Sequence, residues 1–122
     1  MYMKGLSTSD NEVIESLKHL GISRNLATTI TYLKNVPEAS SQEIEMSTGL
    51  RQPEVSVAMR EMRKNGWIKE NSKNVTGKGR PTKIYKLAIP IDAIIGHYES
   101  KIREENEARL AIVEKLKAIS KN

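Results

Sequence analysis

The chain opens with a polar stretch, which is followed by apolar residues at helical spacing. Ser9 and Glu12 fit a capping box, in which Ser9 is the N-cap and Glu12 bonds back to its backbone. Gly21 lies where such a helix would stop. The pattern predicts a loose tail over residues 1–8 and a first helix over about 10–20.

Two further helices follow with similar signals. Ser23 begins the second helix and Pro37 ends it, with apolar residues on one face between them. Ser40 and Glu43 form another capping box, which opens a short third helix. Gly49 is the natural end of that helix.

A fourth helix, about 52–65, is predicted after a turn of only four residues. Pro53 suits its first position, because a missing N–H costs nothing there. At 100° per residue, the apolar residues share one face: Val55, Ala58, Met59 and Met62. The other side carries Pro53, Ser56, Val57, Arg60, Glu61 and Lys64, with Gln52 and Arg63 at the flank. Two helices joined by so short a turn form a helix-turn-helix unit.

The polar side of this fourth helix has the side chains that read bases. Arg can donate two hydrogen bonds to guanine, Gln can pair with adenine, Ser serves either role, and Val can contact a thymine methyl. The expected base-reading residues are Gln52, Ser56, Val57 and Arg60. The expected phosphate contacts, which fix register without reading sequence, are Arg51, Arg63 and Lys64. An ordinary amphipathic surface helix would show a similar pattern, since Arg, Lys and Glu favour helices.

After residue 66 the pattern changes to strand-like alternation. Trp67 and Ile68 begin one strand, and Ile84 to Leu87 alternate as a returning strand that Pro90 stops. The prediction is a two-stranded hairpin over about 67–88.

The hairpin tip, VTGKGRPTKIYKL, is basic and allows three interpretations. A Walker-type phosphate loop does not fit, because Pro81 and a strand follow instead of Ser/Thr and a helix. A plain solvated turn would also use the glycines. In a DNA-binding wing, Pro81 would hold Arg80 extended for a narrow minor groove, where negative potential is high. The expected contacts to backbone or minor groove are Lys73, Lys78, Arg80 and Lys83.

The net charge of +5 comes from one part of the chain. Residues 1–50 carry a net charge of −2 and residues 87–122 are neutral, whereas residues 51–86 hold ten Lys/Arg and three Glu, a net charge of +7. A basic patch attracts an anionic partner, most commonly nucleic acid. A membrane surface fits less well, since this stretch is not one long amphipathic helix.

Composition excludes several classes of function. The chain has no Cys, which removes disulfides, thiolate zinc sites and cysteine nucleophiles. The two histidines, His19 and His97, have no ligand-spaced neighbours, and the carboxylates are spread along helix surfaces. No apolar run approaches the ~20 residues that cross a bilayer, and no signal-peptide pattern begins the chain. We expect a cytoplasmic protein that is not an enzyme and has no metal, cofactor or evident small-molecule ligand.

From Ser23 to Pro90 the chain resembles winged-helix DNA-binding domains of the MarR, ArsR and TrmB type, found in archaeal and bacterial transcriptional regulators. The carrying segments are SSQEIEMSTGL, RQPEVSVAMREMRKNGWIKE and GKGRPTKIYKL, which resemble the scaffold helix, the recognition helix and the wing. The resemblance implies a mainly α (α+β) fold, a winged helix-turn-helix with a two-stranded β wing. It departs from the larger regulators in length, so we expect no separate ligand-sensing domain.

The stretch from Ile91 to about Ser120 predicts one long helix with a heptad seam. Alternating steps of four and three connect Ile91, Ile95, Tyr98, Ile102, Glu105, Arg109, Ile112, Leu116 and Ile119. The helix would be roughly 45 Å long, more than a small domain needs to cover itself. The favoured interpretation is a homodimer, with residues 1–90 binding DNA and 91–122 forming a coiled-coil dimer; packing on its own domain is the alternative. In an antiparallel pair, Glu105 could approach Arg109 of the other copy.

Together these features predict a homodimeric transcriptional regulator that binds specific sequences in double-stranded DNA. The alternative is a winged-helix protein-interaction module in a transcription or RNA-processing assembly, with only nonspecific nucleic-acid binding, because fold does not settle function.

Overall fold

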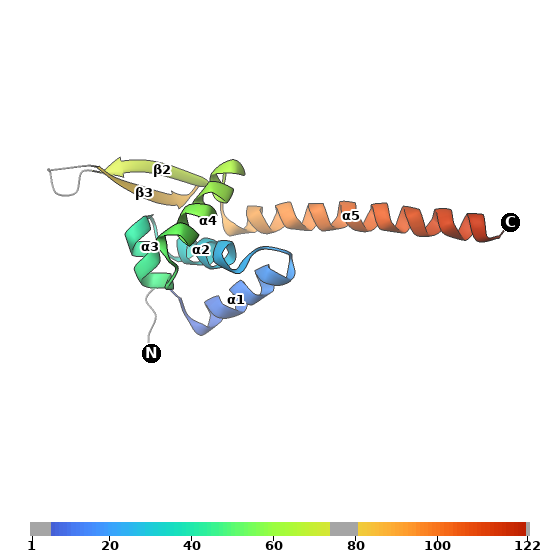
Figure 1. Ribbon diagram of the computed structural model, residues 1–122, viewed down its shortest axis with the longest axis horizontal. Helices are drawn as coiled ribbons and strands as arrows, with labels where there is room; N and C mark the ends of the chain where they lie inside the picture. Colours follow the sequence, from blue (N-terminus) through green and yellow to red (C-terminus); the bar gives the residue numbers. More distant parts are fainter. Residues whose placement is uncertain (1–5, 74–80, 122) are drawn as a thin grey trace. The chain divides into compact units, whose positions relative to one another are not determined.

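The computed structural model describes residues 6–73 and 81–121. It divides into two compact units, Met1–Ile91 and Asp92–Asn122. The order of the described elements is α1 (Thr8–His19), α2 (Arg24–Asn35), β1 (Ala39–Ser40), α3 (Ser41–Thr48), α4 (Gln52–Lys64), β2 (Ile68–Lys73), β3 (Thr82–Leu87) and α5 (Ile91–Ser120) (Figure 1). The second unit consists of α5 beyond its first residue. The predicted long helix is confirmed, and its role in dimerisation stays a prediction.

The start of α1 differs from the prediction. Its N-cap is Ser7, whose Oγ accepts from the Asp10 N–H at 3.2 Å, while Asp10 Oδ2 accepts from the Ser7 N–H at 2.8 Å. The capping box is therefore Ser7 with Asp10 rather than Ser9 with Glu12, so Ser7 and Thr8 belong to the start of the helix and not to a tail. Residues 1–5 of the predicted tail lie outside the described residues. Both pairs have the right spacing, but the Asp10 carboxylate also accepts a hydrogen bond from Asn35 of α2 at 2.8 Å. A tertiary contact decides between two equivalent local patterns.

Asp10 is a buried carboxylate held in its ionised form. Burial raises its pKa, but hydrogen bonds from Asn35 and from Ser7, together with the Lys34 ammonium, bring the pKa below its ordinary value. The contact joins the first turn of α1 to the last turn of α2.

The caps of α2 and α3 are those that the sequence predicts, whereas the start of α4 differs by one residue. Ser23 caps α2, and Ser40 and Glu43 form the predicted capping box of α3. Gly49 ends α3 with φ +80°, a conformation that favours glycine. Helix α4 begins at Gln52, so Pro53 is its second residue rather than its first.

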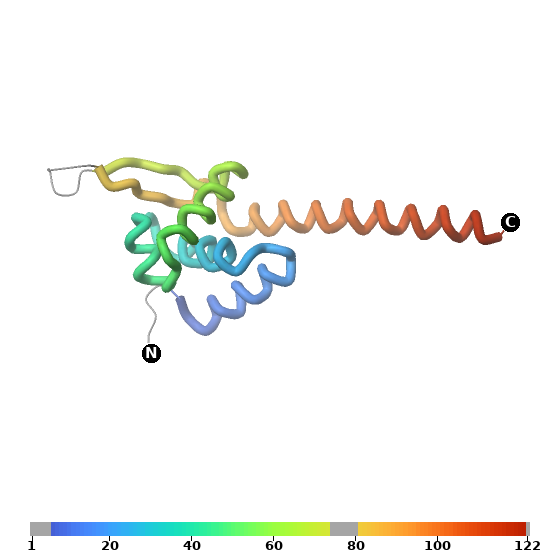
Figure 2. The backbone as a smooth tube through the Cα atoms, viewed as in Figure 1, coloured from blue at the N-terminus to red at the C-terminus, as the bar shows by residue number. Residues whose placement is uncertain are grey.

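Helix α2 lies at the centre of the first unit and contacts α1, α3 and α4 (Figure 2). The fully buried side chains are mostly aliphatic, as a chain without Phe requires. Two buried threonines of α2 satisfy their hydroxyls locally: Thr29 donates to the Asn25 carbonyl and Thr31 to the Ala27 carbonyl, each at 2.8 Å. In the described ranges, no buried side-chain N or O atom lacks a hydrogen-bond partner.

The wing is an antiparallel hairpin, as predicted, but it belongs to a three-stranded sheet with the order β1-β3-β2. Strands β2 and β3 pair from Ile68 opposite Leu87 to Lys73 opposite Thr82. The two-residue strand β1 pairs with β3 and was missed because two residues are too short for an alternation signal. It anchors the returning strand of the wing to the segment before α3.

Candidate nucleic-acid interface

The turn between α3 and α4 is fixed by short-range hydrogen bonds. Thr48 Oγ1 donates to the Ile44 carbonyl at 2.6 Å and accepts from the Leu50 N–H at 3.2 Å, while the Gly49 N–H donates to the Glu45 carbonyl. At the start of α4, Glu54 accepts from the Arg51 N–H at 2.8 Å and from the Asn25 side chain at 3.4 Å. These contacts hold the beginning of α4 against α3 and α2.

The faces of α4 are those that the sequence predicts. Its buried residues are Val55, Ala58, Met59 and Met62. Its exposed residues are Gln52, Pro53, Ser56, Val57, Arg60, Glu61, Arg63 and Lys64. Exposure of an apolar side chain to water does not stabilise a folded protein, yet Val57 is 58% exposed. The exposed side is therefore continuous along the helix and includes one apolar contact surface.

The expected base-reading residues lie together on that side. Gln52 Nε2 donates to Ser56 Oγ at 3.0 Å, one helical turn away. This bond leaves the Gln52 carbonyl oxygen and one amide hydrogen unused. Arg60 makes no hydrogen bond or ion pair with the part of the chain that the structure describes. Its guanidinium is thus available to a partner.

Two of the expected phosphate contacts are engaged within the protein. Arg63 Nε donates to Glu70 Oε1 at 2.7 Å, and its Nη2 contacts the same oxygen. Lys73 forms an ion pair with Glu38. Neither acidic partner was singled out from the sequence, because each pair joins different elements and no local spacing signals it.

The remaining expected cations fall into two groups. Arg51, Lys64 and Lys83 are exposed. Lys78 and Arg80 lie outside the described residues, so their predicted roles stay predictions.

Two lysines that the sequence did not single out add to the positive surface of the sheet. Lys69 of β2 and Lys86 of β3 lie directly opposite each other, and both are exposed. Like charges in such a pair destabilise a sheet. The register that brings them together could not be read from the sequence, since it depends on strand pairing.

Helix α5 carries an uncovered apolar face in its C-terminal half. Ile112, Leu116 and Ile119 of the predicted seam are among its exposed large hydrophobic residues, which range from 40% to 63% exposed. Ile95 is also exposed, whereas Ile91, Tyr98 and Ile102 are half-buried. Glu105 and Arg109 are exposed. Leu110 and Val113 are exposed too, so the apolar face is wider than the predicted seam.

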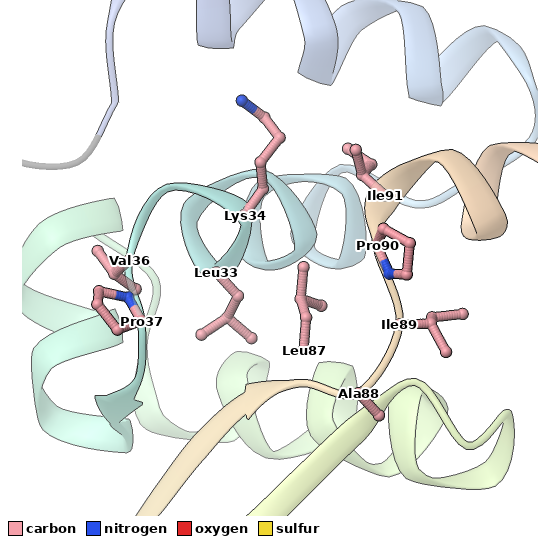
Figure 3. Close-up of a pocket in the computed structure, with 9 residues that line it drawn as sticks. All are labelled: Leu33, Lys34, Val36, Pro37, Leu87, Ala88, Ile89, Pro90 and Ile91. Atoms are coloured by element: carbon pink, nitrogen blue, oxygen red, sulfur yellow. The ribbon is translucent and has the colours of Figure 1, made fainter.

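A cavity of about 450 Å³ lies in the first unit, between the end of α2 and the segment after β3 (Figure 3). Leu33, Val36, Leu87 and Ile89 contribute to its apolar lining. The one charged lining residue, Lys34, points away from Leu33 and Leu87 in Figure 3. Its Nζ contacts Asp10 Oδ1 at 3.5 Å and Asn35 Oδ1 at 3.0 Å. This hollow is open to solvent, and the expectation of no small-molecule ligand stays a prediction.

In the described residues, no group of three or more His, Cys, Asp or Glu side chains is arranged to hold a metal ion. Over the same residues, none of the helices combines the length and apolar character needed to span a membrane.

Comparison with known proteins finds similarity at the level of structure. No protein-family model matches the chain, and no curated protein matches it in sequence. TrmBL2, an archaeal chromatin protein, aligns over 88% of this chain with a TM-score of 0.60 and 18% identity, and this chain spans only 41% of TrmBL2. A possible transcriptional regulator from Methanosarcina mazei Go1 has a TM-score of 0.59 and 17% identity, covering 94% of this chain and 93% of its own.

A third similar structure is MepR of S. aureus in complex with DNA. Its TM-score is 0.51 at 13% identity, covering 91% of this chain and 90% of that one. At these identities the similarity shows the fold. The chain therefore has a winged helix-turn-helix fold, which it shares with these structures.

Proposed function

We propose that this protein is a cytoplasmic, homodimeric transcriptional regulator that binds specific sequences in double-stranded DNA. The observation that carries the proposal is the exposed side of α4, which follows a helix-turn-helix turn and presents Gln52, Ser56, Val57 and Arg60 together. An anchored helix with a continuous polar side is suited to insertion in the major groove.

Base reading would follow from the side-chain chemistry. The Gln52–Ser56 hydrogen bond orients the amide and leaves one donor and one acceptor, the pair that adenine requires. Arg60 would donate two hydrogen bonds to a guanine, and Val57 would contact a thymine methyl. Orienting Gln52 before binding reduces the entropy lost on binding.

Backbone contacts would come from the exposed cations around this helix and on the wing. Arg51 and Lys64 flank the two ends of α4, and Lys83 lies on β3. Lys78 and Arg80 are proposed for the backbone or minor groove from the sequence alone. The net charge of +7 over residues 51–86 favours such contacts.

The dimer would form through α5. An antiparallel pairing of two copies gives the best match of polarity and charge between the facing seam residues. With Glu105 opposite Arg109 of a second copy, the same register places Ile102 opposite Ile112 and Tyr98 opposite Leu116. In this antiparallel register apolar residues contact apolar residues, and each Glu105 lies opposite an Arg109. A parallel pair would instead place Glu105 opposite Glu105, and the two carboxylates would repel each other. A dimer of winged helices predicts a pseudo-palindromic site with half-sites about one helical turn apart.

The test is enrichment of random duplexes by the purified protein, read by sequencing. We expect a pseudo-palindromic motif. Replacing Arg60 by Ala should weaken binding to the preferred duplex by about 1–3 kcal/mol and relax preference at one base pair. Glu12→Ala, an exposed change on α1, is the control. An unchanged motif with Arg60→Ala would refute the assigned readout, and salt-dependent binding without any motif would favour the protein-interaction module.

A further inference from the structure

The ion pair between Arg63 and Glu70 connects the recognition helix to the wing. Arg63 is in the last turn of α4 and Glu70 is the third residue of β2. Two nitrogens of the guanidinium contact one carboxylate oxygen, Oε1, with Nε at 2.7 Å. Arg63 is thus directed toward the sheet, although its position on α4 suits a phosphate contact.

We propose that Glu70 withholds Arg63 from the DNA backbone, so that Arg63 positions the wing against α4 instead of adding a phosphate contact. This inference rests on the proposed function. It changes the role of Arg63 from an electrostatic contact to a positioning residue, and it assigns a role to a carboxylate in the most basic part of the chain.

The surrounding backbone supports a stable pair. The junction between α4 and β2 is short, and the Trp67 N–H donates to the Met62 carbonyl at 2.9 Å. The Trp67 side chain is buried, which fixes the start of β2. Both ends of the ion pair are therefore attached to backbone that is itself held in place.

Partial burial of the Glu70 carboxylate also stabilises the ion pair. The Glu70 side chain is 28% exposed, compared with 52% for Arg63. A carboxylate with less access to water gains more from a cation that contacts it. A phosphate that captured Arg63 would have to separate the two groups and leave Glu70 unpaired.

The expected effect of the pair on binding is modest and measurable. An ion pair that keeps this much contact with water changes an equilibrium by up to about fivefold. The number of phosphate contacts is a sharper readout, because each contact changes the slope of log K against log salt by about 0.9. Lys64, the next residue of α4, is exposed and serves as the comparison.

The experiment measures the salt slope for a random-sequence duplex with the full chain and its variants. Arg63→Gln should leave the slope unchanged, whereas Lys64→Gln should lower it by about 0.9. Glu70→Gln should free Arg63, steepen the slope by about 0.9 and tighten binding up to about fivefold. The double variant, Arg63→Gln with Glu70→Gln, should return to the wild-type slope. Glu12→Gln makes the same change in net charge on α1 and should leave the slope unchanged.

Two results would overturn the proposal. One is a decrease of about 0.9 in the salt slope of Arg63→Gln, as large as that expected for Lys64→Gln. It would mean that Arg63 contacts phosphate in the wild-type protein. The other is a Glu70→Gln variant that behaves like Glu12→Gln. If Glu70→Gln fails to fold, as judged by circular dichroism, the Arg63→Gln measurement still decides. If the wild-type protein binds no duplex at all, the proposed DNA-binding function itself fails.

Discussion

Replacing Leu116 by Ala should weaken the proposed dimer without disturbing the helix. Leu116 lies in the seam of α5 and is 59% exposed in the single chain. In the antiparallel register it would meet Tyr98 of the second copy. Leu and Ala are both strong helix formers, so the substitution tests contact between chains rather than helix formation.

The size of the effect follows from the exposed area. Leu→Ala removes about three methylene equivalents, each contributing about 0.8 kcal/mol when fully buried, or about 2.4 kcal/mol in all. Since the residue is 59% exposed, about 1.4 kcal/mol of that gain would come from the partner. Two copies of the contact give about 2.8 kcal/mol, which raises the dimer dissociation constant about 100-fold.

Sedimentation equilibrium over a range of protein concentrations measures this constant directly. Glu107→Ala, on the side of α5 opposite the seam, is the matched control and should change it little. A wild-type protein that is monomeric at micromolar concentration would refute the seam. An unchanged dissociation constant for Leu116→Ala would refute the register and the face assigned to it.

Two other predictions concern the wing and the first helix. Lys83→Gln should weaken binding to all duplexes alike and lower the salt slope by about 0.9; a change in the preferred motif would contradict its assignment to the backbone. Asp10→Asn should destabilise the protein at pH 7 by about 1–2 kcal/mol, because an ionised acceptor of hydrogen bonds from Ser7 and Asn35 is lost. Burial raises the pKa of Asp10, but its hydrogen bonds outweigh burial, so the pKa in the folded protein lies below the ordinary value of 3.8. The ionised carboxylate therefore stabilises the fold at pH values above 3.8. This contribution is lost as the pH falls through the lowered pKa. The difference in melting temperature between wild type and variant should therefore shrink below about pH 3.8, and an equal difference at pH 7 and pH 2.5 would contradict the assignment.

The helices and the faces of α4 follow from the sequence because their signals are local. The capping box at Ser40 and Glu43, the glycine at position 49 and the 100° spacing of Val55 to Met62 each involve residues within one or two turns. Such signals do not need the rest of the fold. The hairpin was predicted for the same reason, since strand alternation is also a local pattern.

Local patterns fail where two of them compete or where an element is very short. Ser9 with Glu12 fits a capping box as well as Ser7 with Asp10, and only the contact of Asp10 with Asn35 selects the second pair. Strand β1 has two residues and exists only because β3 pairs with it.

The sequence by itself determined the order of the helices, the apolar and polar sides of α4, the basic central stretch and the extent of the long helix α5. The tertiary structure alone decided which of the described cations form ion pairs within the protein. Arg51, Arg63, Lys64 and Lys73 look alike in the sequence, yet Arg63 meets Glu70 and Lys73 meets Glu38. The physical reason is that charge along a chain is a one-dimensional property, whereas an ion pair depends on the distance between side chains that folding brings together from different elements.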